Sequence, residues 1–390
     1  MEIFRLDQFN DLLEMEGEQK VSIFSPTSRS SSDNYQQDKI NFKNQLKEAL
    51  TQLMEKYEWK EEESKTFLAP GYELLEDVAF WQHSSDAVAF FHSSAGTIIK
   101  QLPFELDAPS SFVGKNFMLK PLVPLLNANS RFYILNLNQN DVRLYEAGMH
   151  SYSEVVFPED VPATIDDYLV YVHRQESLQF RSGGSSGGNG GAMFHGHGAA
   201  NTDKIDIEQY FYELSKKVEE IIACEPLPVV LAGVEYLIPI YRKTADYNGY
   251  VEGYVQGSFA EGDAASLYEK ALEVMEPIFE KKQQDAQDRF KELQFGEWAS
   301  FEPEKVILAA LTGQVDTLFV RKQEAIWGHY NESLYTLTLE EESTAENKDL
   351  LTEACVKTIL QNGQVYMCAR EDMPEEGAVV AAIFRNPVTI

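Results

Sequence analysis

The chain has 390 residues, with 33 lysines and arginines against 63 acidic residues, and a formal net charge of -30. This excess of acids makes non-specific attraction of the whole chain to a polyphosphate unfavourable, so any nucleic-acid contact must be a local surface. A hydrophobic content of 44% with 12% aromatic residues is sufficient for packed cores, and the length predicts two or three domains. No apolar run reaches the roughly eighteen residues of a membrane span, and the acidic start MEIFRLDQFNDLLEME does not resemble a signal peptide. We therefore expect a soluble, cytoplasmic protein without a membrane partner.

The cysteine content supports a reducing compartment. Cys224, Cys355 and Cys368 occur without any CxxC pair. This pattern argues against a disulfide framework and against a zinc ribbon. Each cysteine is predicted to be a small buried apolar residue rather than a nucleophile.

The first region, residues 1–126, is predicted to be an α+β domain. Residues 28–37 are polar and are expected to form a loop. Apolar side chains recur at helical spacing within 42–65, and Asp86–Phe91 has the pattern of a strand. The apolar stripe of the expected helix consists of Leu46, Leu50, Leu53, Met54 and Tyr57.

The second region, residues 127–262, is predicted to be a central α/β domain. Arg131–Leu137 and Asp141–Tyr145 have strand character and are separated by turn-like residues. Pro228–Gly233 has the pattern of a buried strand that ends in glycine. Alternation of such strands with helices predicts layers of helices on a sheet.

A glycine-rich loop, residues 181–200, interrupts this central domain. Eight of its twenty residues are glycine, and ordering them costs more backbone entropy than ordering other residues. One interpretation is a flexible surface linker. The other is a functional loop, because the tract lies between an apolar run at 168–172, which has β character, and an amphipathic helix.

The helix expected after the loop has its N-cap candidates at Asn201, Thr202 and Asp203. Its apolar residues recur every three or four positions, which predicts one buried face. They are Ile207, Tyr210, Phe211, Leu214, Val218, Ile221 and Ile222.

The third region, residues 263–390, is predicted to be an α/β domain. It begins with a long helix from about Ala264 to Leu293, bent or interrupted at Pro277. The following apolar patterns predict, in order, helix, strand, helix, strand and strand. The corresponding residues are 304–311, 317–320, 350–361, 364–367 and 378–384.

Two stretches of this third region resemble the C-terminal domain of archaeo-eukaryotic class-1 release factors and Pelota. Glu304–Val320 (EKVILAALTGQVDTLFV) is similar to the passage in which a helix, a Gly-x-Val-[Asp/Glu]-Thr-Leu turn and a strand follow one another. Cys355–Met367 and Met373–Arg385 are similar to the closing helix, the strand and the Ala-Ile-[Leu/Phe]-Arg end of that domain. Residues 111–145 resemble the bacterial branch of the superfamily, so the resemblance covers roughly residues 80–390.

The resemblance implies three domains, of which the central one is ribonuclease-H-like with a glycine-rich loop before a long helix. It also implies a translation factor that occupies a ribosomal tRNA site, in rescue, termination or hibernation. The expected partners are the ribosome, through rRNA or tRNA, and possible protein partners, with no cofactor and no metal. Arg174 and Arg181, which flank the loop, are the candidate nucleic-acid contacts.

The loop departs from the Gly-Gly-Gln motif of true release factors, whose glutamine helps to place water against the peptidyl-tRNA ester. No glutamine lies between Arg181 and Lys204, although Asn189 offers a shorter amide. The segment from Ala199 to Glu225 contains three lysines and seven acidic residues, whereas a helix that faces the ribosome would be basic. We therefore expect binding without glutamine-dependent peptide release, and the catalytic residues are unknown. The loop candidates are Gly183, Gly184, Gly187, Gly188, Asn189, Gly190, Gly191, His195 and His197.

Two alternative functions stay open. His195 and His197 supply two imidazoles that titrate near neutral pH, and they suggest a hydrolase of RNA or of aminoacyl or peptidyl esters. Asp203 and Asp206 lie nearby in the sequence as the candidates to complete a metal site with them. An HxH pair by itself supplies only two of the three or four ligands of a metal site. The other alternative is an acidic protein-interaction scaffold, which the net charge of -30 favours.

Overall fold

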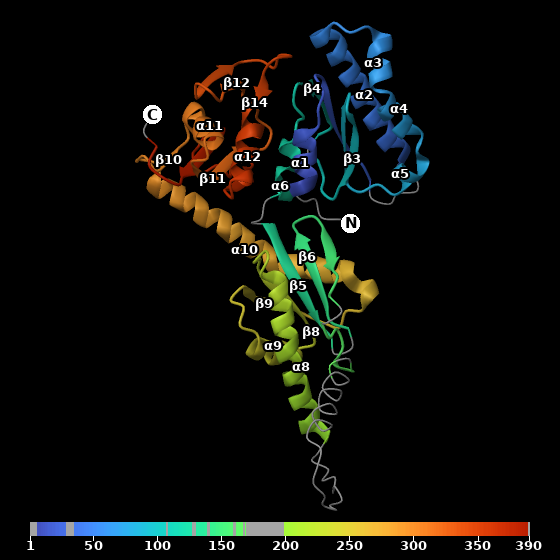
Figure 1. Ribbon diagram of the computed structural model, residues 1–390, viewed down its shortest axis with the longest axis vertical. Coiled ribbons are helices and arrows are strands. Elements are labelled where there is room, and N and C mark those ends of the chain that lie inside the picture. The colour runs from blue at the N-terminus through green and yellow to red at the C-terminus, as the bar shows by residue number, and fades with distance from the viewer. Residues whose placement is uncertain are drawn as a thin grey trace, which may run out of the picture. The chain divides into compact units, whose positions relative to one another are not determined.

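The computed structural model describes residues 6–28, 35–106, 108–126, 130–138, 141–158, 161–166, 168 and 199–388. The chain divides into two compact units (Figure 1). One unit spans residues 130–280, and the other combines residues 4–129 with residues 281–390. Each unit contains sheets covered by helices, so the mixed α/β and α+β class expected from the sequence is confirmed. The division into three domains, with boundaries after residues 126 and 262, stays a prediction.

The N-terminal part of the second unit is an antiparallel sheet in the order β3-β2-β1-β4. The strands are β1 (Lys20–Pro26), β2 (Ala87–Ser93), β3 (Gly96–Leu102) and β4 (Ser110–Gly114). Strand β2, predicted over 86–91, is buried along its whole length because helices cover both faces of the sheet. The helices are α1 (Leu6–Glu14), α2 (Tyr35–Tyr57), α3 (Glu61–Phe67), α4 (Ala69–Glu76) and α5 (Val78–Gln82).

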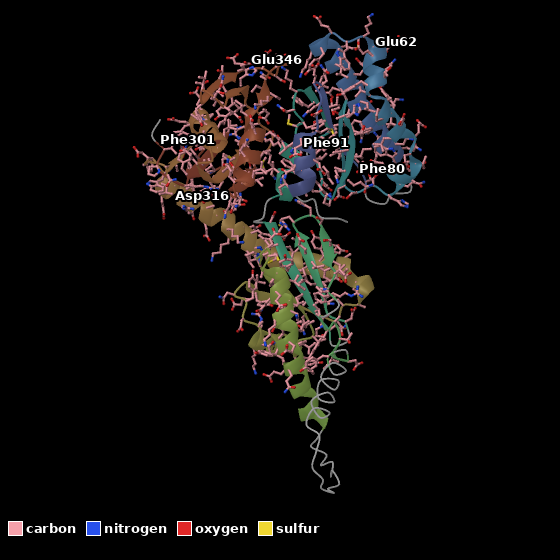
Figure 2. All side chains as sticks on the ribbon, in the orientation of Figure 1. Glu62, Phe80, Phe91, Phe301, Asp316 and Glu346 are labelled. Atoms are coloured by element: carbon pink, nitrogen blue, oxygen red, sulfur yellow. The ribbon has the colours of Figure 1, made fainter. Side chains whose placement is uncertain are left out.

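Alternate residues of β2 point to opposite faces, which explains how one short strand serves two cores. Phe90 packs on Phe42 of α2, with ring centroids 5.7 Å apart. Phe91 lies on the face that carries α1, where it contacts Phe24 at 5.6 Å (Figure 2). The sheet is therefore the middle of three layers.

Helix α2 differs from the predicted helix at both ends. The chain is already helical at Tyr35, so the first turn includes residues that the sequence placed in a loop. The helix ends at Tyr57, and Glu58 takes a left-handed conformation with φ 56° before α3 begins. The prediction of one continuous helix through residue 65 was wrong, whereas Leu46 and Leu53 of its stripe are fully buried.

The C-terminal part of the second unit contains a sheet in the order β10-β16-β11-β15 and a smaller sheet in the order β13-β12-β14. Helix α10 continues through Pro277, so the predicted interruption does not occur. Residues 281–293 of α10 (Ala264–Leu293) belong to this unit, together with α11 (Pro303–Leu311) and α12 (Leu350–Leu360). The strands are β10 (Ala299–Ser300), β11 (Val315–Arg321), β12 (Trp327–Asn331), β13 (Thr336–Glu340), β14 (Lys348–Asp349), β15 (Gln364–Cys368) and β16 (Val380–Phe384). The predicted order of helix, strand, helix, strand and strand is confirmed, and β12 to β14 are additional.

The N-terminal and C-terminal parts of this unit share cores. The short elements η1 (Lys120–Leu122) and α6 (Val123–Leu126) lie at their junction. Val123 belongs to the C-terminal core, and the buried Lys120 Nζ donates to the Glu324 carbonyl. The two parts are thus held by apolar packing and by a buried hydrogen bond.

The first unit is a five-stranded mixed sheet in the order β7-β6-β5-β8-β9. Its central strand β5 pairs antiparallel with β6 and parallel with β8, which confirms the predicted strands in residues 131–145 and 228–233. One face carries α8 and α9, and the other carries the first half of α10. The strands are β5 (Arg131–Leu137), β6 (Arg143–Gly148), β7 (Tyr152–Val155), β8 (Val229–Gly233) and β9 (Tyr250–Gln256), and the helices are α8 (Ala199–Ile222) and α9 (Leu237–Thr244).

Candidate functional site: the helix after the glycine-rich loop

The residues that the sequence proposed for the loop lie outside the described residues. They are Arg174, Arg181, Gly183, Gly184, Gly187, Gly188, Asn189, Gly190, Gly191, His195 and His197. The structure describes the chain up to Tyr168 on one side and from Ala199 on the other. The candidate site is therefore characterised through its support, helix α8 and the side chains that hold it.

The chain on both sides of the loop is helical. Helix α8 begins at Ala199, so Asn201 to Asp203 lie inside its first two turns and the predicted N-cap position was wrong. Before the loop, the Tyr168 amide donates to the Thr164 carbonyl at 3.3 Å in a helical turn. The β character predicted from residue 168 onward is therefore wrong at Tyr168, and the remainder of that run lies outside the described residues.

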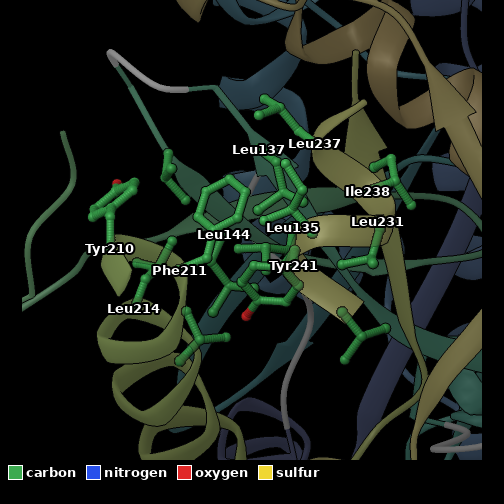
Figure 3. Close-up of a cluster of buried hydrophobic side chains, with 14 of the residues drawn as sticks. Leu135, Leu137, Leu144, Tyr210, Phe211, Leu214, Leu231, Leu237, Ile238 and Tyr241 are labelled. Carbon is green, nitrogen blue, oxygen red and sulfur yellow. The ribbon is translucent and has the colours of Figure 1, made fainter. Parts of the chain in front are cut away.

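The predicted apolar stripe of α8 is confirmed. Tyr210, Phe211 and Leu214 are fully buried, and they pack on the sheet beside α9 (Figure 3). Their partners are leucines of three strands together with Tyr241, whose ring lies 5.4 Å from that of Phe211. Burial of such large side chains stabilises the helix by about 1.5–3 kcal/mol each. Packing thus fixes α8 along its length after Ile207.

Polar contacts add specific anchors to this packing. Ser215 Oγ donates to the Thr244 carbonyl at the end of α9, at 2.9 Å. The Glu219 carboxylate accepts from the amides of Asp246 and Tyr247, at 2.9 and 3.0 Å. These bonds satisfy backbone groups that follow α9, and they fix the rotation of α8 about its axis.

One anchor links α8 to the segment that enters the loop. The Tyr210 hydroxyl donates to the Pro162 carbonyl at 3.1 Å, and its ring lies 5.8 Å from the ring of Tyr168. Eleven residues separate Tyr210 from Ala199, or about 16 Å of helix at 1.5 Å per residue. In Figure 1 the first turns of α8 run beyond the sheet. The loop is thus carried by a helix end that extends away from a fixed base.

The C-terminal end of α8 is held by an arginine whose role was not predicted from the sequence. Arg131 opens β5 and pairs with Glu146 of β6 and with Glu225, which follows α8. The side chains of Arg131 and Glu146 are only 16% and 6% exposed. Removing one partner of such a buried ion pair is strongly destabilising, because it leaves an isolated charge in the interior. An arginine at the start of an apolar strand was the available signal, but its partners are distant in sequence.

Three tyrosines near this end are structural rather than catalytic. The hydroxyls of Tyr241 and Tyr250 lie 3.1 Å apart, and burial raises the pKa of both groups well above the ordinary value. Burial, reinforced by the charge of Glu146, raises the pKa of Tyr133 to about 12. All three phenols stay protonated at neutral pH, and those of Tyr241 and Tyr250 hydrogen-bond to each other.

The solvent face of α8 is acidic, and its two described lysines have acidic neighbours. Lys216 lies 3.9 Å from Glu213, and Lys217 lies 3.3 Å from Glu220. Lys216 also covers the ring of Tyr212 at 3.8 Å. Among its described residues, this face therefore offers no free cluster of positive charge to a nucleic acid.

The described residues offer few groups for metal binding or thiol chemistry. They contain no group of three or more histidine, cysteine, aspartate or glutamate side chains that could hold a metal ion. Cys355 and Cys368 are buried as predicted, and burial raises the pKa of each thiol to about 12. Cys224 is exposed, and here the prediction of a buried residue was wrong because the helix ends just before it. No described helix is long and apolar enough to cross a membrane.

Comparison with known proteins finds one family model that is similar to this unit. Residues 132–277 match the family model of bacterial archaeo-eukaryotic release factor family 7. No curated protein matches the chain. Among solved structures, the archaeal translation termination factor aRF1 is 14% identical over 97% of this chain and 96% of that chain, with a TM-score of 0.24. Dom34 of S. cerevisiae, a translation termination-like factor of RNA quality control that interacts with Hbs1, is 9% identical over 77% and 81% of the two chains, with a TM-score of 0.33.

A further match is archaeal Pelota in its ribosome-bound form with ABCE1, at 9% identity over 98% and 94% of the two chains and a TM-score of 0.38. These TM-scores are too low to support a common fold, so the likeness rests on the family match. That match spans the five-stranded sheet, the loop and α8. Through this central region, the chain is similar to the bacterial archaeo-eukaryotic release factors.

Proposed function

We propose that this protein is a ribosome-associated translation factor that occupies a tRNA site, in rescue, termination or hibernation, without glutamine-dependent peptide release. The observation that carries the proposal is the family match over residues 132–277, which contain the glycine-rich loop and its supporting helix. Functional loops are commonly carried by rigid scaffolds. The packing of Phe211, the Ser215 bond and the Arg131 pairs supply such a scaffold.

The chemistry of the loop limits what it does at the ribosome. Peptide release by the family's mechanism uses a glutamine after two glycines, and no glutamine lies between Arg181 and Lys204. Gly187 and Gly188 are followed by Asn189, whose amide is one methylene shorter. Water held by the asparagine would lie out of position, and an error of about 1 Å in such a site costs on the order of a hundredfold in rate. We therefore assign the loop a binding role.

Sucrose-gradient sedimentation of cell lysate at low and moderate salt tests the ribosomal assignment. The protein should travel with ribosomes at low salt and leave them as salt rises, because contacts to phosphate release counterions. A variant that lacks residues 182–197 should sediment less with ribosomes while keeping its fold. Absence of the wild-type protein from ribosomal fractions at every salt concentration would refute the proposal.

A release assay on ribosomes that carry peptidyl-tRNA tests the binding role separately. The wild-type protein should release no peptide, and Asn189→Gln, which restores the Gly-Gly-Gln order, should gain activity. Release by the wild type would contradict the assignment. If that release were lost in His195→Ala or His197→Ala, the loop would act as a hydrolase through its histidines.

A further inference from the structure

Helix α2 carries a regular set of three lysines, Lys39, Lys43 and Lys47, spaced four residues apart. Residues at this spacing lie on one helix face, about 6 Å apart along the axis. Lys43 and Lys47 are exposed, and Lys39 is half-buried. We propose that this lysine ladder is an RNA-binding surface that contacts consecutive phosphates. The inference rests on the proposed function, because it names where the acidic chain touches ribosomal RNA.

The lysines of the ladder form no ion pair with any residue that the structure describes. Paired lysines occur elsewhere, as Lys65 with Glu61 at 2.6 Å and Lys291 with Asp288 at 3.2 Å, whereas Lys281 is exposed without a described ion pair. The ladder differs from such single lysines because its three charges follow one another on one helix face. A polyanion with regularly spaced phosphates gains most from this arrangement.

The surroundings of the ladder reverse the charge of the chain. From Tyr35 to Lys47 there are three lysines and one acid, which gives +2 against -30 for the whole protein. That acid, Asp38, is only 4% exposed and accepts a hydrogen bond from the Ser28 amide at 3.0 Å. The segment is also the N-terminal half of α2, where the helix dipole adds positive potential.

The partner is best described as RNA rather than a membrane. A membrane-surface helix needs a free apolar face, and α2 buries its apolar face in its own sheet through Phe42 and Leu46. Ile40, 50% exposed, is the one large hydrophobic residue exposed between positions 35 and 47. Next to the lysines, Gln36, Gln37 and Asn44 expose amides, which hydrogen-bond phosphate and sugar oxygens.

The test compares two charge-reversal variants of the full chain with equal net charge. Lys39→Glu/Lys43→Glu/Lys47→Glu removes the ladder, and Lys65→Glu/Lys281→Glu/Lys291→Glu reverses three exposed lysines elsewhere. Binding to a short RNA duplex and to purified ribosomes is measured against salt concentration. The ladder variant should bind at least roughly tenfold more weakly at low salt, and its slope of log K against log salt should fall by about two to three. The control should stay within about twofold of the wild type.

The outcomes separate this inference from the proposed function. The inference would be overturned if the ladder variant kept the RNA affinity and the salt slope of the wild type. It would also be overturned if the ladder variant and the control variant lost RNA affinity equally. If the wild type bound poly-glutamate through these lysines but not RNA, the partner would be an acidic protein and the inference would be wrong. If only the ribosome were not bound, while RNA binding still depended on the lysines, the ladder would stand and the proposed function would fail. Circular dichroism of each variant checks that a loss of RNA binding is not caused by unfolding. The variant Lys39→Gln/Lys43→Gln/Lys47→Gln removes the positive charges without adding negative ones, and it should also bind RNA more weakly than the wild type.

Discussion

Helices α2 and α8 bury similar apolar faces but expose faces of different charge. They have 23 and 24 residues, and each buries an aromatic and aliphatic face on the sheet of its own unit. On α8, Lys216 and Lys217 have acidic neighbours, whereas the lysines in the first half of α2 form no ion pair with a described residue. The comparison teaches that a net charge of -30 does not describe every face of the chain, because single helices differ in their balance of lysines and acids.

The largest expected effects come from the buried faces, where the two helices should behave alike. Phe211→Ala in α8 and Phe42→Ala in α2 each empty a site that is fully buried. Each should lower the free energy of unfolding by about 3–5 kcal/mol. Urea denaturation measures this, with the exposed Glu208→Ala as a control expected within about 0.5 kcal/mol. If either variant lowered the free energy of unfolding by less than about 1 kcal/mol, the two helices would not be anchored alike.

The buried cation at the end of α8 should come next. Arg131→Met leaves Glu146 buried without its partner and should cost about 3 kcal/mol. The double variant Arg131→Met/Glu146→Leu removes both charges and should recover most of that loss. Denaturant midpoints of the two variants decide the matter, and equal destabilisation in both would show that the charge pairing is not the cause.

A smaller difference should separate single hydrogen bonds on the two helices. Ser215→Ala removes a buried bond from α8 to Thr244 and should cost about 1 kcal/mol. Thr51→Ala on α2 removes an exposed bond to the Lys47 carbonyl in the same helix and should change stability by a few tenths. Thermal unfolding ranks the two, and the reverse order would contradict the anchoring role of Ser215.

The smallest effect is expected from the lysines of α8. Lys216→Ala/Lys217→Ala breaks surface pairs with Glu213 and Glu220 and should leave the stability of the protein nearly unchanged. The salt dependence of ribosome binding should also stay at the wild-type slope, in contrast to the ladder variant. A slope reduced by about two would assign the RNA contact to α8 instead.

Local patterns predicted the elements in which burial follows a period. The stripe of α8 and the buried strand within Pro228–Gly233 were predicted because their side chains face a core in every turn or at every position. Strand β13 (Thr336–Glu340) was not predicted, since it is only partly buried and carries three polar residues among five. The break at Glu58 was also missed, because a left-handed residue leaves no mark on hydrophobic spacing.

The candidate site was predictable only in outline. The glycine-rich loop and the helix after it were visible in the sequence. The functional role of the loop residues stays a prediction. The anchors were not visible, because Arg131 reaches Glu225 across 94 positions and Ser215 reaches Thr244 across 29. Such pairs exist only once the sheet has brought the strands together. The lysine ladder was present in the sequence, but the helix had been predicted to begin after its first member.

Competition between this protein and tRNA for purified bacterial ribosomes tests the central claim most directly. Labelled full-length protein is bound to vacant ribosomes at low salt, and tRNA is then added to fill the tRNA sites in turn. We predict that the protein binds vacant ribosomes and is displaced when one particular site is filled. Binding that is unaffected by tRNA at every site, or no binding to vacant ribosomes, would contradict the account.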